Sequence, residues 1–202
     1  MVDGFGSLPQ RRVRSKRSDN QTRPRVQWKS GDLFWQTPTQ STAIYENSFS
    51  LRNSDLISEK NSIYFSNNKN EFFALDERTG VIKWKRTLNS NLRPTYADGV
   101  VFTVTLEGYL VVIDSRNGNI VRMTNIFEQI KKYKKNNIKP EGFIVARDEI
   151  YLSLSNGKLI IIDIKTGKSK NILKINNGKI SRPYVLNNNM YIVRDNSIIK
   201  LN

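Results

Sequence analysis

Carboxylates are the side chains best suited to chemistry here, because the sequence contains no cysteine and no histidine. Their absence excludes thiolate nucleophiles, histidine acid–base catalysis, Ser-His-Asp triads and zinc sites built from Cys and His. Three aspartates recur in one setting: Asp76, Asp114 and Asp163 each end an apolar run and stand four residues before a glycine. Carboxylates in such a pattern suit either a calcium site or a set of turns.

The spacing of these pairs favours turns. The glycines are Gly80, Gly118 and Gly167, and they follow one another at intervals of 38 and 49 residues. An aspartate side chain accepts hydrogen bonds from backbone N–H groups two or three residues later, and glycine takes the positive φ of such a turn. Because each aspartate occurs once per repeat, we expect them to lie in separate units. We therefore predict structural turns, no metal site and no catalytic residue.

Each repeat contains four short β patterns that are separated by turn residues. The second repeat illustrates this, with strands expected over 93–97, 100–106, 109–114 and 119–124 and turns at Asp98-Gly99 and Glu107-Gly108. A period of about 40 residues with four strands is typical of a β-propeller blade, and a sandwich or barrel of similar hairpins is the alternative. We predict an all-β propeller of four-stranded antiparallel blades, with about four blades in this chain.

The first repeat carries a recognisable motif, Ala74-Leu75-Asp76-x-x-Thr79-Gly80-x-x-x-Trp84-Lys85. It resembles the repeat of PQQ-type propellers, the quinoprotein-like superfamily. Within that superfamily, the chain is similar to the BamB-type lipoproteins of the outer-membrane β-barrel assembly machinery, on residues 31–36, 53–55, 74–85 and 191–201. The resemblance covers about 31–202 and implies the C-terminal half of an eight-bladed ring. Later repeats depart from the motif, since Arg122 and Asn171 stand where Trp84 stands in the first.

The resemblance implies a non-enzymatic scaffold without a cofactor, located in the periplasm at the outer membrane. Its partner would be the periplasmic domains of the barrel-inserting subunit, and the positions that match the family's docking residues are Asn53 and Asp55, beside Arg52. The alternative is a degenerate or fragmentary quinoprotein dehydrogenase. A PQQ site takes groups from all round a ring, which half a ring does not supply. Trp35 and Trp84 are accordingly expected to pack between blades.

The net charge of +15 is unevenly distributed. Residues 1–30 carry eight basic and two acidic residues without hydrophobic periodicity, and we predict a disordered basic tail before a propeller over 31–202. A nucleic-acid role for the cluster 11–17 is a further alternative, but no aromatic residue interleaves it, and we predict no nucleic-acid partner. Residues 127–139 hold five lysines and one glutamate. They suggest an amphipathic helix or basic loop, either solvated or touching anionic lipid.

The two ends of the repeat region look complementary. Residues 31–37 match the last strand of a repeat without its unit, and Ser197–Leu201 ends a unit that has three strand patterns. Pairing the two would close a ring of four blades; an open arc or self-association through exposed sheet faces is the alternative. Residues 1–30 contain no apolar signal core and no lipidation cysteine, so we expect a fragment, a mis-started reading frame or a divergent short relative.

Overall fold

The computed structural model describes residues 32–39, 53–67, 69–129 and 138–201. Within these ranges the regular elements are β-strands and one 3₁₀ turn, η1 (Phe127–Gln129), so the predicted all-β class is confirmed. None of the described helical residues forms a segment long and apolar enough to cross a membrane. The predicted basic tail 1–30, Arg52 and the lysine-rich stretch 130–137 lie outside the described residues.

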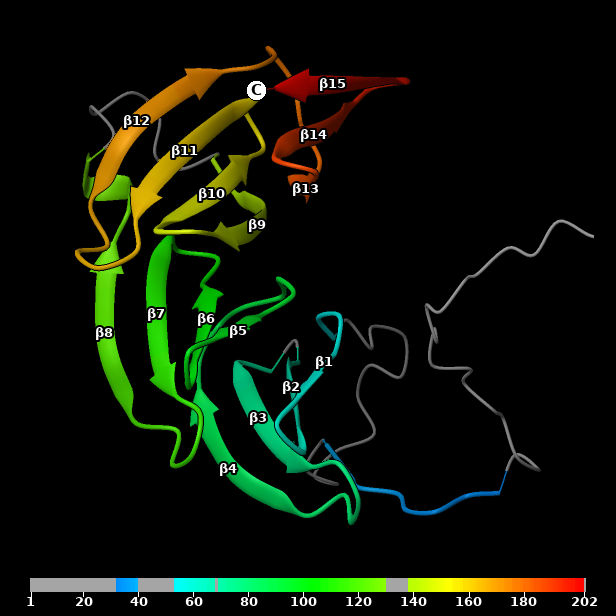
Figure 1. Cartoon of the computed structure of the whole chain (residues 1–202). Helices are drawn as coiled ribbons and strands as arrows, with labels where there is room; N and C mark the ends of the chain where they lie inside the picture. The colour runs from blue at the N-terminus through cyan, green and yellow to red at the C-terminus, as the bar shows by residue number, and fades with distance from the viewer. Residues whose placement is uncertain (1–31, 40–52, 68, 130–137, 202) are drawn as a thin grey trace, which may run out of the picture. The chain divides into compact units, whose positions relative to one another are not determined.

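The strands form antiparallel sheets whose members are neighbours in chain order (Figure 1). The first sheet contains β1 (Ile57–Glu59), β2 (Ser62–Ser66), β3 (Glu71–Asp76) and β4 (Ile82–Thr87). The second contains β5 (Thr95–Ala97), β6 (Val100–Val104), β7 (Tyr109–Asp114) and β8 (Ile120–Asn125). The third contains β9 (Pro140–Ala146), β10 (Glu149–Leu154), β11 (Lys158–Asp163) and β12 (Ser169–Lys174). The fourth sheet contains β13 (Tyr184–Leu186), β14 (Asn189–Arg194) and β15 (Ser197–Leu201).

Tight turns set the register of these sheets. Lys60 and Asn61 connect β1 to β2 with φ of 51° and 58°, and Asp98 and Gly99 connect β5 to β6 with φ of 47° and 81°. Two consecutive residues with positive φ make the hairpin turn whose twist matches that of the flanking strands. Because side chains alternate across a strand, neighbouring residues of a central strand lie on opposite faces of the sheet, and consecutive residues of β3, β6 and β7 are buried on both faces.

Successive sheets pack face to face through apolar side chains. Tyr64, Phe72 and Trp84 of the first sheet pack against Val101 and Ile113 of the second. A larger cluster joins the second sheet to the third, and a smaller one around Leu159, Ile180 and Ile192 joins the third to the fourth. Four sheets that pack face to face against their sequence neighbours are blades of a propeller, as the repeat predicts.

The sequence suggests that the two ends of the repeat region could pair. Residues 32–39 carry no assigned strand, and β15 has β14 as its sole strand neighbour within the described part of the chain. The pairing that would close a ring is therefore not present among the described residues.

Phe127, expected on the apolar face of an amphipathic helix, is 8% exposed and packs in the core between the second and third sheets.

Candidate functional site

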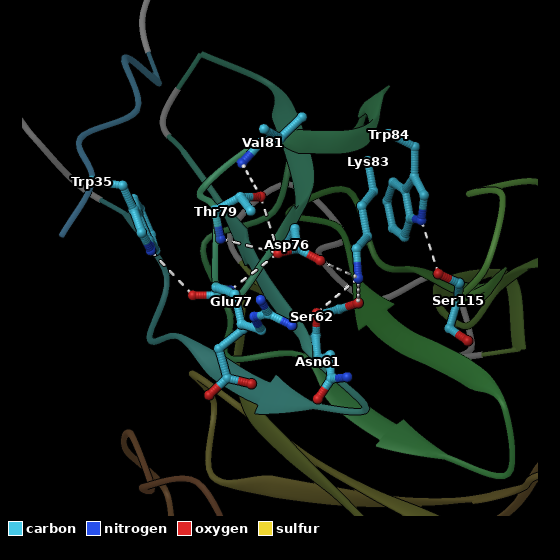
Figure 2. Close-up of polar contacts among 11 residues, drawn as sticks. Trp35, Asn61, Ser62, Asp76, Glu77, Thr79, Val81, Lys83, Trp84 and Ser115 are labelled. Carbon is cyan, nitrogen blue, oxygen red and sulfur yellow. Dashed lines mark hydrogen bonds and ion pairs between the residues drawn. The ribbon is translucent and has the colours of Figure 1, made fainter.

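The turn after β3 is organised by the carboxylate of Asp76 (Figure 2). Its Oδ1 accepts hydrogen bonds from the backbone N–H of Arg78 and of Thr79 and from the Thr79 hydroxyl, at 3.1, 3.0 and 3.0 Å. Lys83 Nζ lies 3.3 Å from the other oxygen, Oδ2. The Thr79 N–H and hydroxyl, followed by Lys83, lower the pKa of Asp76 to about 2, because all of them favour its charged form.

The other two aspartates occupy equivalent turns. Asp163 Oδ1 accepts from the backbone N–H and the hydroxyl of Thr166, at 2.8 and 2.9 Å, and these bonds lower its pKa. Asp114 pairs instead with the Arg116 side chain at 2.9 Å, which, with the Arg116 N–H, lowers the pKa of Asp114 to about 2. The three carboxylates end strands of three different sheets, and no cluster suited to a metal ion occurs among the described residues.

Each turn ends in a glycine that touches the preceding unit. Gly80, Gly118 and Gly167 have φ of 71°, 72° and 71°, where a Cβ is strained. A Cβ on Gly118 would lie 2.6 Å from Cδ2 of Trp84. The glycine is therefore required both by the backbone conformation and by the space that the indole occupies.

Trp84 attaches the first blade to this turn of the second. Its Nε1 donates to the carbonyl of Ser115 at 2.9 Å, and Arg86 Nε, two residues further along β4, donates to the carbonyl of Gly118 at 2.6 Å. The indole is 6% exposed and lies nearly parallel to the Phe72 ring, with the centroids 6.0 Å apart. Trp84 thus lies between blades, buried against both sheets.

The same contact occurs at two further places. Trp35 Nε1 donates to the carbonyl of Glu77 at 3.1 Å, as Figure 2 shows, and the Thr37 hydroxyl donates to the carbonyl of Gly80 at 2.5 Å. At the third blade, Arg122 takes the position of the indole, and its guanidinium donates to the carbonyls of Ile164, at 2.6 Å, and Lys165. Arg122 therefore makes the contact that a tryptophan makes at the first two turns, so the second repeat keeps this contact although it lacks the tryptophan of the motif.

The residues predicted to bind a partner lie just before β1. Asn53 and Asp55 are exposed, whereas Ser54 between them is 5% exposed. Ser54 N–H donates to the carbonyl of Ser66 at 2.8 Å, and Ser66 N–H donates to the Ser54 hydroxyl at 2.9 Å. These two bonds hold the segment so that its neighbours face solvent.

Sequence reasoning missed two arginines at corresponding places in other blades. Arg93 precedes β5 and Arg182 precedes β13, and each is followed by a proline. Arg182 is partly buried, and its Nε donates to the carbonyl of Phe143 at 2.8 Å. Burial and then Arg93 lower the pKa of Arg182, while Asp55 opposes them, so both neighbouring charges act on Arg182. The sequence signal that could have found both arginines is the Arg-Pro pair, which recurs before the first strand of two blades.

A family model described as outer membrane protein assembly factor BamB matches residues 25–124 of this chain. That range contains the Asp76 and Asp114 turns and both docked tryptophans. Residues 25–124 of this β-propeller match the BamB-like PQQ-repeat family. No curated protein matches its sequence.

Solved structures share the fold of this chain. BamB from Moraxella catarrhalis aligns with TM-score 0.50 and 15% identity over 65% of this chain and 39% of that one. Sqt1 from Saccharomyces cerevisiae aligns with TM-score 0.62 and 15% identity over 75% and 46%. The computationally designed Ika4 protein aligns with TM-score 0.60 and 11% identity over 79% of this chain and 94% of its own. The chain thus spans about two fifths of the solved BamB.

Proposed function

We propose that this chain is a non-enzymatic propeller scaffold that docks a partner protein during outer-membrane protein assembly, on the periplasmic side. The observation that carries the proposal is the match of residues 25–124 to the assembly-factor family. The periplasmic location and the partner, the periplasmic domains of a barrel-inserting subunit, come from the resemblance. We also propose that the propeller comprises 31–202 and that the basic tail 1–30 is separate from it.

The proposed docking surface is formed by the segments that precede the first strand of a blade. Asn53 and Asp55 project from a segment that Ser54 anchors to β2, and Arg182 is held by its bond to the third blade. Side chains placed by a rigid scaffold lose little conformational entropy on binding. Charges of both signs, Asp55 with Arg93 and Arg182, then select a partner with the complementary pattern.

The test is a binding titration with the purified periplasmic domains of the barrel-inserting subunit from the organism that encodes this chain. Asp55→Lys is expected to raise Kd by about tenfold, because it replaces an attractive contact with a repulsive one. Asn53→Asp is expected to lower Kd. Glu77→Lys is the matched control, since this exposed acid lies in the outer turn of the same blade. Equal Kd values for Asp55→Lys and Glu77→Lys would contradict the proposed surface.

Two further measurements address the alternatives. Adding PQQ and Ca²⁺ with an electron-accepting dye is expected to give no dye reduction, and measurable reduction would overturn the non-enzymatic proposal. Deleting residues 1–30 is expected to leave partner binding and the melting temperature unchanged. If the deletion abolished partner binding, the tail would belong to the functional unit.

A further inference from the structure

The cavity between the third and fourth sheets lies where the first two sheets enclose an indole. Tyr64, Ala74 and Trp84 of the first sheet lie opposite one another across β2, β3 and β4. The corresponding row of the third sheet, across β10, β11 and β12, consists of Tyr151, Ile161 and Asn171. In both sheets the register of the outer strand pair shifts directly after this row. Asn171 is therefore the counterpart of Trp84.

The facing walls of the two junctions also correspond. Val101 and Ile113 of the second sheet pack with Trp84 and lie opposite each other on β6 and β7. Met190 and Leu201 lie opposite each other on β14 and β15 of the fourth sheet. Val101 and Met190 are each the second residue of a strand that follows a turn of two residues with positive φ. The cavity of about 640 Å³ is lined by counterparts of the residues that surround Trp84, among them Tyr151, Leu159, Ile161, Met190 and Leu201.

The cavity is open because of the side chain on β12. In the first junction the space is filled from the preceding blade, by Trp84 of β4. At the third blade Asn171 is exposed, and its Oδ1 accepts a hydrogen bond from the backbone N–H of Ile172 at 2.8 Å. β12 itself contains no aromatic residue. The walls for a ring are therefore present, but the outer strand that supplies the ring in the first blade supplies none here.

We propose that this cavity binds the indole ring of a tryptophan that a partner protein presents. Walls of the same kind already hold an indole in this chain, since Trp84 is 6% exposed between them. The volume lies within the range of roughly 300–1,000 Å³ that is typical of binding pockets. Burying the ring there removes apolar surface from water. The partner rests on the proposed function, whereas the ring site rests on the cavity alone.

The rim of the cavity offers a hydrogen-bond acceptor for the indole N–H. The carboxylate of Glu149 lines the cavity and accepts from the Tyr151 hydroxyl at 2.6 Å and from Lys170 Nζ at 3.0 Å. These two bonds lower the pKa of Glu149, because both favour its charged form. A carboxylate has about four acceptor sites, so capacity remains for a third donor. Apolar walls with one fixed acceptor at the rim suit an indole, which has a single donor.

The methionines report binding directly. Met190 lines the cavity, whereas Met123 is 49% exposed on β8. With ¹³C-labelled methionine methyl groups, titration with N-acetyl-tryptophanamide is expected to displace the Met190 signal through the ring current and to leave that of Met123 in place, with a Kd on the order of 1 mM. N-acetyl-leucinamide is the matched probe without a ring, and we expect it to bind at least about tenfold more weakly. Equal displacement of both methyl signals, or equal binding of the two probes, would overturn the proposal.

Asn171→Trp provides an independent test, because it fills the cavity from the chain itself, as Trp84 fills the first junction. It is expected to raise the Kd of N-acetyl-tryptophanamide by at least about tenfold. Val121→Trp, at a position that is 63% exposed on β8, adds an indole elsewhere and is expected to leave this Kd unchanged. Both positions are exposed, so both variants are expected to keep the parent far-UV CD spectrum. Equal Kd values for the two variants would contradict an indole site at this junction.

Further measurements identify the source of the ring. Asn171→Trp is expected to weaken binding of the barrel-inserting subunit's periplasmic domains as well, and an unchanged Kd for that partner would overturn it as the source. Binding of free indole without binding of N-acetyl-tryptophanamide would overturn it in favour of a small molecule. Displacement of the Met190 signal by Trp28→Ala, with no probe present, would overturn it in favour of the chain's own tryptophan. The small-probe titrations contain no partner protein, so their failure would leave the proposed function intact.

Discussion

The junction between the first and second blades differs sharply from that between the third and fourth. At the first, Trp84 is 6% exposed, and its indole covers the turn that ends at Gly118. At the junction between the third and fourth blades, Asn171 is exposed at the equivalent place on β12, and a cavity of about 640 Å³ lies between the sheets. The junction is filled where the outer-strand side chain packs on the turn of the next blade, so the two act as one structural unit.

The junction between the second and third blades lies between these extremes. Arg122 replaces the indole and donates to two backbone carbonyls of the next turn. Its Nε is buried and, within the described part of the chain, has no hydrogen-bond partner. A guanidinium thus reproduces the polar contact of the tryptophan while it leaves one buried donor unsatisfied, which costs free energy.

Trp84→Ala is expected to have the largest effect, since it converts the filled junction into an empty one. Truncating a buried aromatic residue costs roughly 3–5 kcal/mol of unfolding free energy. Trp35→Ala is expected to cost less, because Trp35 is partly exposed. Urea unfolding followed by far-UV CD measures both. If both variants lost the same free energy of unfolding, the burial of Trp84 against the second blade would contribute nothing beyond its contact with the turn.

Gly118→Ala tests the other half of the same junction. Gly118 and Gly99 both have positive φ, but a Cβ on Gly99 would meet nothing within 4 Å, whereas on Gly118 it would meet Trp84. We expect Gly99→Ala to cost about 1 kcal/mol for the strained φ and Gly118→Ala to cost about 2 kcal/mol more, because the indole must move. If the two variants shift the urea midpoint equally, the close contact between Gly118 and the Trp84 indole does not contribute to stability.

Acid is expected to weaken the turns at the junctions. The pKa values of Asp76 and Asp114 are about 2 in the folded chain, below the ordinary 3.8. A lowered pKa stabilises the fold above pH 3.8, and this contribution disappears as the pH falls towards 2. Thermal melts between about pH 5 and pH 2 are expected to show a steeper loss for the parent than for Asp76→Asn. Parallel pH profiles would rule out a turn contribution from this carboxylate.

Asn171→Trp is expected to give the smallest change, and it is a gain. The substitution reconstructs at the third blade the side chain that fills the first junction, and filling a cavity commonly adds about 0.5–2 kcal/mol. Val121→Trp, on the exposed part of β8, is the matched control for an added indole. A gain in the urea midpoint for the control alone would show that position 171 does not reach the cavity.

The sequence by itself determined the strands and the turns. The predicted bounds of β7 and β15 coincide with those in the structure. The Asp–Gly turns were equally predictable, because the hydrogen bonds within them join residues no more than five positions apart. Alternation and turn chemistry act over such short distances that local sequence is sufficient.

Only the tertiary structure decided how the blades meet. It showed that Arg122 substitutes for a tryptophan, that Phe127 is buried, and that Asp55 acts electrostatically on Arg182. The contacts of Arg122 join residues more than 40 positions apart. Such contacts depend on how two complete sheets pack, so a single repeat does not encode them.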